Sequence, residues 1–105
     1  MIHPRQKNGA IPVPVAVLEA LAKRRLTISE IMVVLAVCSQ ADISPGKAKT
    51  TVAVLARTMG VRKDSAASLI RHAIQKRILN ATVSGEGSMV RIMTVNSPDE
   101  WAVPG

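Results

Sequence analysis

The chain has 105 residues, of which 48% are hydrophobic, and it carries a formal net charge of +7. This length and this hydrophobic content predict one folded domain and exclude a largely disordered chain. Aromatic residues make up only 1%, so the core must consist of aliphatic side chains. The positive charge favours a polyanionic partner, because net charge governs association more than fold.

Cysteine content and hydrophobic segments exclude several other classes of protein. The single cysteine, Cys38, allows no internal disulfide and no cysteine-based zinc site. It lies in the apolar run 31–38, where a buried thiol is expected and where eight residues are too few to cross a membrane. The apolar segment 10–18 contains two prolines and leads into a basic cluster, unlike a signal peptide. We therefore expect a cytoplasmic protein without a membrane partner.

The first half of the chain predicts an arm and two helices. Residues 1–13 are rich in proline and basic residues and are predicted as an extended arm, either bound in a DNA minor groove or frayed. Apolar spacing predicts a helix over 14–25. The sequence TISE at 27–30 is typical of a capping box and begins a second helix over 28–41. Because 31–38 is apolar almost all round, this helix is predicted to be central or to meet a second subunit.

The second half predicts two further helices and a hairpin. Asp, Ser-Pro and Gly predict a loop over 41–50, and Thr50 or Thr51 then caps a short helix over 51–58 that Gly60 ends. A fourth helix is expected over 63–77. Alternating residues on either side of GEGS predict a β-hairpin over 79–95, followed by a polar tail over 96–105. The apolar face of the fourth helix is predicted to consist of Ala66, Leu69, Ile70, Ala73 and Ile74.

The residues that carry enzyme chemistry are absent or scattered. The two histidines, His3 and His72, have no Cys, Asp or Glu at metal-ligand spacing. No glycine-rich phosphate loop and no nucleophile elbow is present. We therefore expect no catalytic residue, no metal, no cofactor and no small-molecule ligand.

A twenty-residue unit over 52–71 carries a resemblance to a known family. It places small, glycine and apolar residues at the spacing of a helix-turn-helix, and these residues are Ala56, Gly60, Val61, Ala66 and Leu69. With the hairpin directly after it, the stretch 28–95 resembles the winged helix-turn-helix family. The resemblance implies a mainly α fold with a small β-hairpin, organised as a winged helix-turn-helix domain over 14–95.

The pattern is similar to the DNA-binding domain of phage and plasmid replication proteins, such as replication protein O of lambdoid phages, and to small plasmid-encoded regulators. This resemblance implies a sequence-specific protein that binds double-stranded DNA, with the helix over 63–77 in the major groove and the hairpin as a wing. The implied contact residues are Thr50, Thr51, Arg57, Arg62, Lys63, Ser65, Ala67, Ser68, Arg71, His72 and Arg91.

These residues have different expected roles. Arg71 is expected to grip guanine, and Ser65 and Ser68 are expected to contact a base edge or a phosphate, whereas Lys63 suits either. The remaining threonines and arginines before residue 63 are expected on phosphates. Arg91 is either a backbone contact of the wing or an ordinary strand residue, and a solvent-facing His72 is favoured over a phosphate contact. Asp64 is expected to stabilise the helix end.

A homodimer is expected, because one recognition helix buries little surface on DNA. The predicted seam is the first helix, through Val13, Val17, Leu18 and Leu21. The sequence leaves open a repressor, a replication factor or a partition factor, located on the nucleoid or on a plasmid. The alternative is a protein-interaction module that uses the apolar helix 31–38 on the same scaffold.

Overall fold

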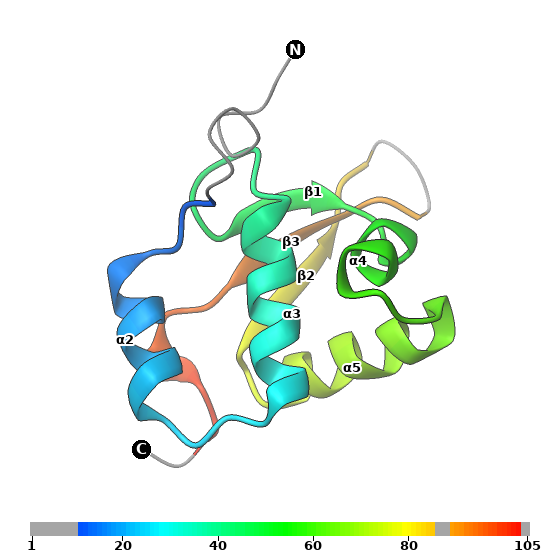
Figure 1. The fold of residues 1–105 in the computed structure, drawn as a ribbon. Coiled ribbons are helices and arrows are strands. Elements are labelled where there is room, and N and C mark those ends of the chain that lie inside the picture. The colour runs from blue at the N-terminus through cyan, green and yellow to red at the C-terminus, as the bar shows by residue number, and fades with distance from the viewer. Residues whose placement is uncertain (1–10, 86–88, 104–105) are drawn as a thin grey trace.

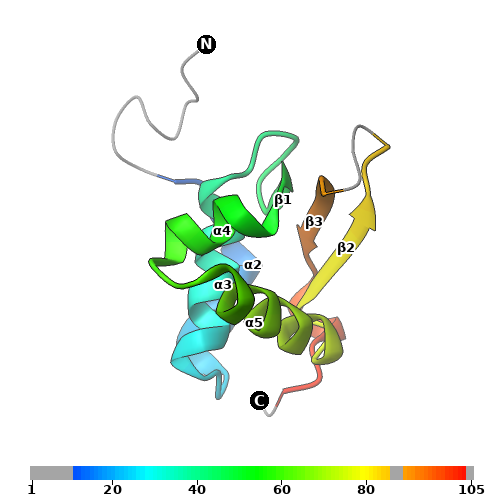
Figure 2. The same cartoon turned by 90° about the vertical axis from the view of Figure 1, so that its right-hand side faces the viewer.

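The computed structural model describes residues 11–85 and 89–103, which form helices and a small sheet (Figure 1). In chain order the elements are α2 (Val15–Lys23), α3 (Ile28–Ser39), β1 (Lys47–Thr50), α4 (Val52–Met59), α5 (Lys63–Gln75), β2 (Leu79–Val83), β3 (Arg91–Val95) and the 3-10 helix η1 (Pro98–Glu100). In Figure 2 the sheet lies on the right and α3 and α4 lie to its left. The predicted helices and hairpin are confirmed within a mixed α/β domain.

The sheet has one strand more than the sequence predicted. Its order is β1-β3-β2 and both pairings are antiparallel, with Thr50 opposite Arg91 in one and Leu79 opposite Val95 in the other. The predicted loop over 41–50 is therefore wrong at its end, where β1 begins. This strand has only four residues, and its pairing partner lies more than 40 positions later. Such long-range pairing leaves little local signal, because strand preference depends strongly on context.

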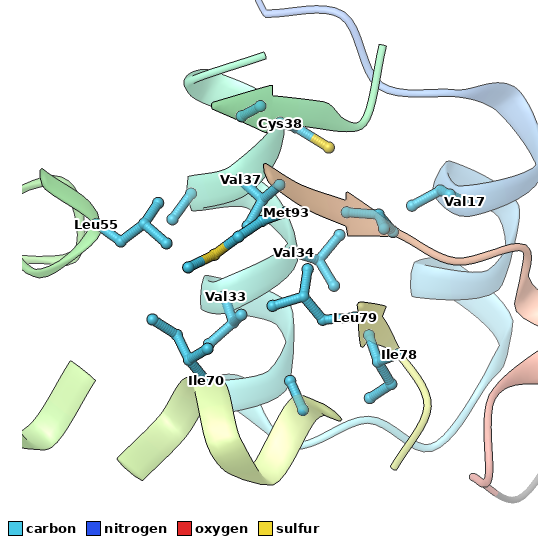
Figure 3. Close-up of a cluster of buried hydrophobic side chains, with 14 of the residues drawn as sticks. Val17, Val33, Val34, Val37, Cys38, Leu55, Ile70, Ile78, Leu79 and Met93 are labelled. Atoms are coloured by element: carbon cyan, nitrogen blue, oxygen red, sulfur yellow. The ribbon is translucent and has the colours of Figure 1, made fainter. Parts of the chain in front are cut away.

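The core is aliphatic, as expected, and α3 runs through its centre (Figure 3). Val33, Val34 and Val37 are at most 1% exposed, and the Cys38 thiol is fully buried. The side chains that α3 meets from other elements include Leu55, Ile70, Leu79 and Met93. Of the two predicted roles of this helix, the central one is confirmed.

Side-chain caps fix where two helices begin. Thr27 Oγ1 accepts from the Glu30 N–H at 3.1 Å, and Glu30 Oε1 accepts from the Thr27 N–H at 2.8 Å. The predicted capping box is thus confirmed. Thr51 caps α4, since its hydroxyl accepts from the Val54 N–H at 3.2 Å. Each cap satisfies backbone donors that the first helical turn leaves unpaired.

The first helix uses its apolar face within the chain. Val17 is 3% exposed, and Val13 and Leu21 pack partly buried against the core. Leu18 is the exception, with 56% of its surface exposed. The predicted dimer seam is therefore largely wrong, because three of its four residues already cover their own core.

Helix α5 ends at Gln75, two residues earlier than predicted. Arg77 adopts the left-handed region with φ 59°, which takes the chain out of the helix. Its N–H donates to the Ile74 carbonyl at 3.0 Å, and the Ile78 N–H donates to the Ala73 carbonyl at 3.0 Å. This pair of bonds is a Schellman motif. The predicted apolar face is confirmed at its buried alanines and Ile70, but Ile74 is 39% exposed.

The residues after β3 belong to the domain instead of forming a polar tail. Trp101 is 5% exposed, and its Nε1 donates to the Asn96 carbonyl at 2.9 Å. Pro98 is also buried, and the Ala102 N–H donates to the Lys76 carbonyl at 2.7 Å. The domain therefore reaches at least residue 103. Most of the predicted arm, residues 1–10, lies outside the described residues.

Candidate nucleic-acid interface

A tight turn joins α4 to α5 and sets the angle between them. Gly60 follows α4 with φ 72°, and the Val61 N–H donates to the Ala56 carbonyl at 3.0 Å. Ala56 and Ala66 are buried, and α4 and α5 pack against one another. Gly60 therefore has the left-handed backbone that a tight turn between these helices needs.

The outward face of α5 is slim and polar. Lys63, Ser65, Ser68 and Arg71 are exposed, whereas Ala67 is half-buried. The opposite face carries Ala66, Ile70 and Ala73, all buried. Two serines and an alanine leave the backbone of this helix open to close approach, and Arg71 supplies a long cationic side chain beside them. The sequence predicted an outward position for all five residues, and it is confirmed for four of them, whereas Ala67 is only partly exposed.

A groove of about 640 Å³ separates α5 from the strand that follows the hairpin turn. Its lining residues are Val52, Arg62, Lys63, Asp64, Ala67, Met89 and Arg91. Figure 2 shows the same arrangement, with α5 in front and the β2–β3 hairpin beside it. Among the described lining residues, the three cations Arg62, Lys63 and Arg91 outnumber the one carboxylate, Asp64. Sequence reasoning missed Val52 and Met89, because neither apolar residue carries a local signal for a groove.

The carboxylate of the groove is held by local contacts. Arg62 Nη2 lies 3.2 Å from Asp64 Oδ2, and both side chains are more than two-thirds exposed. Asp64 Oδ1 also accepts from the Ser65 N–H at 3.0 Å, at the positive end of the helix. An ion pair this exposed contributes little to stability. Arg62 can therefore exchange Asp64 for a phosphate at little energetic cost.

Two of the predicted phosphate contacts differ in accessibility. Thr50 is 6% exposed, so its side chain is not on the surface that the other residues share. Its Oγ1 has no hydrogen-bond partner within the described part of the chain. Thr51 is half-buried and its hydroxyl oxygen serves the cap of α4, which leaves the hydroxyl hydrogen available to donate. Thr50 therefore has no place on this surface.

The two remaining predicted arginines lie on α4 and on β3. Arg57 is exposed on α4. Arg91 is half-buried on β3, where its Nη1 donates to the Val90 carbonyl at 3.2 Å and its side chain lines the groove. The glycine and serine expected at the hairpin tip, Gly87 and Ser88, lie outside the described residues.

His72 is half exposed and also contacts a buried carboxylate of α3. Its Nε2 lies 2.9 Å from Glu30 Oε2, which joins α5 to the first turn of α3. The Glu30 carboxylate is 4% exposed and the His72 ring is 47% exposed. The predicted exposure of His72 is thus confirmed for about half of its side chain, whereas its contact with Glu30 was not predicted. Sequence reasoning missed Glu30 as its partner, because the two residues are 42 positions apart.

The environment of Glu30 favours its charged form. Burial raises the pKa of this carboxyl, but the Thr27 hydrogen bonds and the neighbouring His72 outweigh it and hold the pKa below its ordinary value. The buried carboxylate thus fixes two helices at once. It caps α3 through the backbone of Thr27 and holds α5 through His72.

Comparisons with other proteins do not assign this chain to a known family. Searches of protein-family models, curated proteins and solved structures found no match to the chain. Within residues 11–85 and 89–103, no three His, Cys, Asp or Glu side chains are grouped to hold a metal ion. The helices of that same part of the chain are too short or too polar to span a membrane.

Proposed function

We propose that this chain is a sequence-specific double-stranded DNA-binding protein of the winged helix-turn-helix type. In this proposal α5 enters the major groove, and the β2–β3 hairpin is the wing beside it. The observation that carries the proposal is the outward face of α5, where small side chains and Arg71 lie beside the cationic groove. A face made only for solvent has no need of this combination of slim profile and flanking cations.

The chemistry of the exposed residues fits the two kinds of DNA contact. Arg71 offers the planar fork that binds guanine through two hydrogen bonds, and Ser65 and Ser68 offer hydroxyls to base edges or phosphates. Arg62 and Lys63 lie at the N-terminal end of α5 and Arg57 is exposed on α4, and all three suit phosphates on either side of a groove. Phosphate contacts orient the protein, and the face of α5 reads the sequence.

The decisive experiment introduces a carboxylate into this face. We expect Ala67→Glu to abolish binding to double-stranded DNA, because it adds bulk and negative charge where the groove edge would lie. Glutamate is well tolerated in helices, so the variant should fold, as circular dichroism would show. Fluorescence anisotropy with duplexes selected from a randomised pool measures the affinity.

The matched control is Ala22→Glu, at an exposed position of α2. It makes the same change in net charge on a different element, and we expect it to bind nearly as the unmodified protein does. If a folded Ala67→Glu variant bound DNA as well as this control, α5 would not be the DNA-reading helix and the proposal would fail.

The alternative, a protein-interaction module, makes a different prediction about salt. DNA binding weakens steeply with added salt, because bound protein releases condensed counterions. An apolar contact through α3 shows no such loss. If the affinity of the chain for its binding partner stayed constant between low and moderate salt, the result would favour the protein-interaction module.

The biological role follows from the arrangement of target sites. A nucleoid- or plasmid-bound repressor and a phage or plasmid replication or partition factor would share the geometry proposed here. Footprinting on the DNA that flanks its own gene separates them. An inverted repeat would favour a repressor, and an array of direct repeats would favour replication or partition.

A further inference from the structure

The outer side of α3 carries an apolar stripe that the rest of the described chain leaves partly exposed. Ile28, Met32, Leu35 and Ser39 follow one another at intervals of four, three and four residues, which places them on one side of a helix. Ile28 is 78% exposed and Leu35 is 38% exposed. In Figure 1 this central helix lies in front of the sheet, between α2 and α4. The stripe is thus the one side of α3 that the core does not use.

A hollow lies beside the C-terminal half of the stripe. It measures about 330 Å³ and its lining residues are Ile11, Met32, Leu35, Ala36, Ser39, Thr58 and Met59. Ala36 and Ser39 are its small members. At the other end of the stripe Ile28 is the most exposed large apolar side chain among the described residues. The side chain of Ile28 therefore projects from the N-terminal half of the stripe, and the hollow lies beside Ala36 and Ser39 in the C-terminal half.

The charge of this surface separates it from the rest of the molecule. The chain carries a net charge of +7, so two copies repel one another over most approaches. The only charged residue of α3 is Glu30, which is buried and bound by Thr27 and His72. None of the residues that line the hollow is charged. Two copies can meet here without placing like charges in contact.

We propose that the stripe is the interface with a second copy of this chain, formed by antiparallel pairing of the two α3 helices about a two-fold axis. The intervals of four, three and four residues are the same in either chain direction, so an antiparallel copy presents the same spacing. Ile28 of one copy then lies opposite Ser39 and the recess of the other, and Met32 lies opposite Leu35. Such an interface is self-complementary, as two-fold symmetry requires.

The inference is independent of the proposed function. Helix α3 lies in front in Figure 1, whereas α5 lies in front in Figure 2 after a turn of 90°, so we expect both α5 helices to stay accessible in the pair. One helix of 12 residues is about 18 Å long. An interface of that length is small, and we expect a weak dimer whose population rises with protein concentration.

Cross-linking through one introduced cysteine tests the geometry. The native Cys38 is buried, and burial raises the pKa of its thiol, so it stays unreactive in the folded protein. Leu35→Cys places a reactive thiol near the two-fold axis, and we expect a short bis-maleimide to convert it efficiently to a covalent dimer. Thr82→Cys, on the exposed β2, is the matched control and should give little dimer.

Sedimentation supplies the second measurement, again without DNA. We expect the unmodified protein to show a monomer–dimer equilibrium, Leu35→Glu to be a folded monomer, and Leu18→Glu on α2 to associate as the unmodified protein does. A protein that stayed monomeric at submillimolar concentration would overturn the inference. So would a dimer that Leu18→Glu disrupts and Leu35→Glu does not, or equal cross-linking of the two cysteine variants. None of these results would contradict the DNA-binding proposal, which the Ala67→Glu variant tests separately.

Discussion

At the scale of single residues, Gly60 and Arg77 both end a helix, but they differ in backbone strain. Both adopt left-handed backbone, with φ 72° and 59°, and both lead the chain out of a helix. The residue after each donates to a carbonyl five positions back, Val61 to Ala56 and Ile78 to Ala73. Glycine adopts this conformation freely, whereas a residue with a Cβ is strained by roughly 1–2 kcal/mol.

Exchanging the residue types at these two turns should therefore change stability in opposite directions. We expect Arg77→Gly to raise the free energy of unfolding by about 0.5–1 kcal/mol, and Gly60→Ala to lower it by about 1 kcal/mol. A Cβ at Gly60 would meet no atom within 4 Å, so the loss reports backbone strain alone. Urea unfolding followed by circular dichroism measures both. A stabilised Gly60→Ala variant would contradict this account of the turn.

The Glu30 carboxyl links stability to pH. Its pKa is lower in the folded protein than the ordinary 4.5, so within the interval between these values the unfolded chain binds more protons. The stability that Glu30 contributes is thus complete above the unfolded pKa and is lost as the pH falls through the folded pKa. We expect the difference in unfolding free energy between the unmodified protein and Glu30→Gln to shrink as the pH falls below the ordinary pKa of 4.5.

The Glu30→Gln comparison isolates this group, because every other carboxyl is present in both proteins. Urea unfolding at a series of pH values provides the difference. A difference that stayed constant across that range would show that the lowered pKa of Glu30 does not contribute to the acid sensitivity of the fold.

At the scale of elements, α5 predicts how affinity and specificity divide between its side chains. We expect Arg71→Ala to cost roughly 1–3 kcal/mol on a selected site and to relax the preference at one base position, while random duplexes bind almost as before. Arg57→Ala is the matched control on α4, and it should weaken selected and random duplexes about equally. Anisotropy titrations with both duplexes compare them. Equal losses for the two variants would mean that Arg71 contacts phosphate.

The elements also show what a sequence can and cannot predict. The capping box at Thr27, the glycine turn at Gly60 and the alternation around the hairpin are local patterns, and all three are confirmed. The strand β1 and the Glu30–His72 contact depend on residues more than 40 positions apart, and no local pattern encodes them. The dimer seam on α2 failed for a related reason. Apolar periodicity shows that a helix has a buried face, but it does not show whether that face meets its own core or another chain.

Among the proposed DNA-binding residues, those that follow from local helical periodicity were predictable, and those that depend on long-range contacts were not. The exposed positions of α5 follow from helical periodicity, once the buried face is known. Thr50 was misplaced because its strand was not foreseen, and its side chain turned inward with the alternation of β1. The groove between α5 and β3 joins residues from 52 to 91, so only the fold brings its lining together.

At the scale of the whole molecule, the question is whether the net charge of +7 acts evenly or through one surface. An even charge attracts DNA to every face, so the loss of any lysine would weaken binding by the same amount. Contacts confined to the α4–α5 surface give a different result. Arg57, Arg62 and Lys63, the three proposed phosphate contacts, would each release about 0.9 counterions, which predicts a slope of roughly −2.7 for log K against log salt per protomer.

Lysines on two faces distinguish these possibilities. Lys63 lies at the start of α5 in the groove, whereas Lys23 ends α2 on another element, beside Glu19 at 3.8 Å. Lys63→Ala and Lys23→Ala lower the net charge equally. We expect Lys63→Ala to flatten the salt slope by about one unit, and Lys23→Ala to leave it unchanged, because counterion release counts only phosphates that are actually neutralised. Anisotropy titrations on random duplexes at a series of salt concentrations measure the slopes. Equal flattening by the two variants would show that the charge attracts DNA without a defined binding surface.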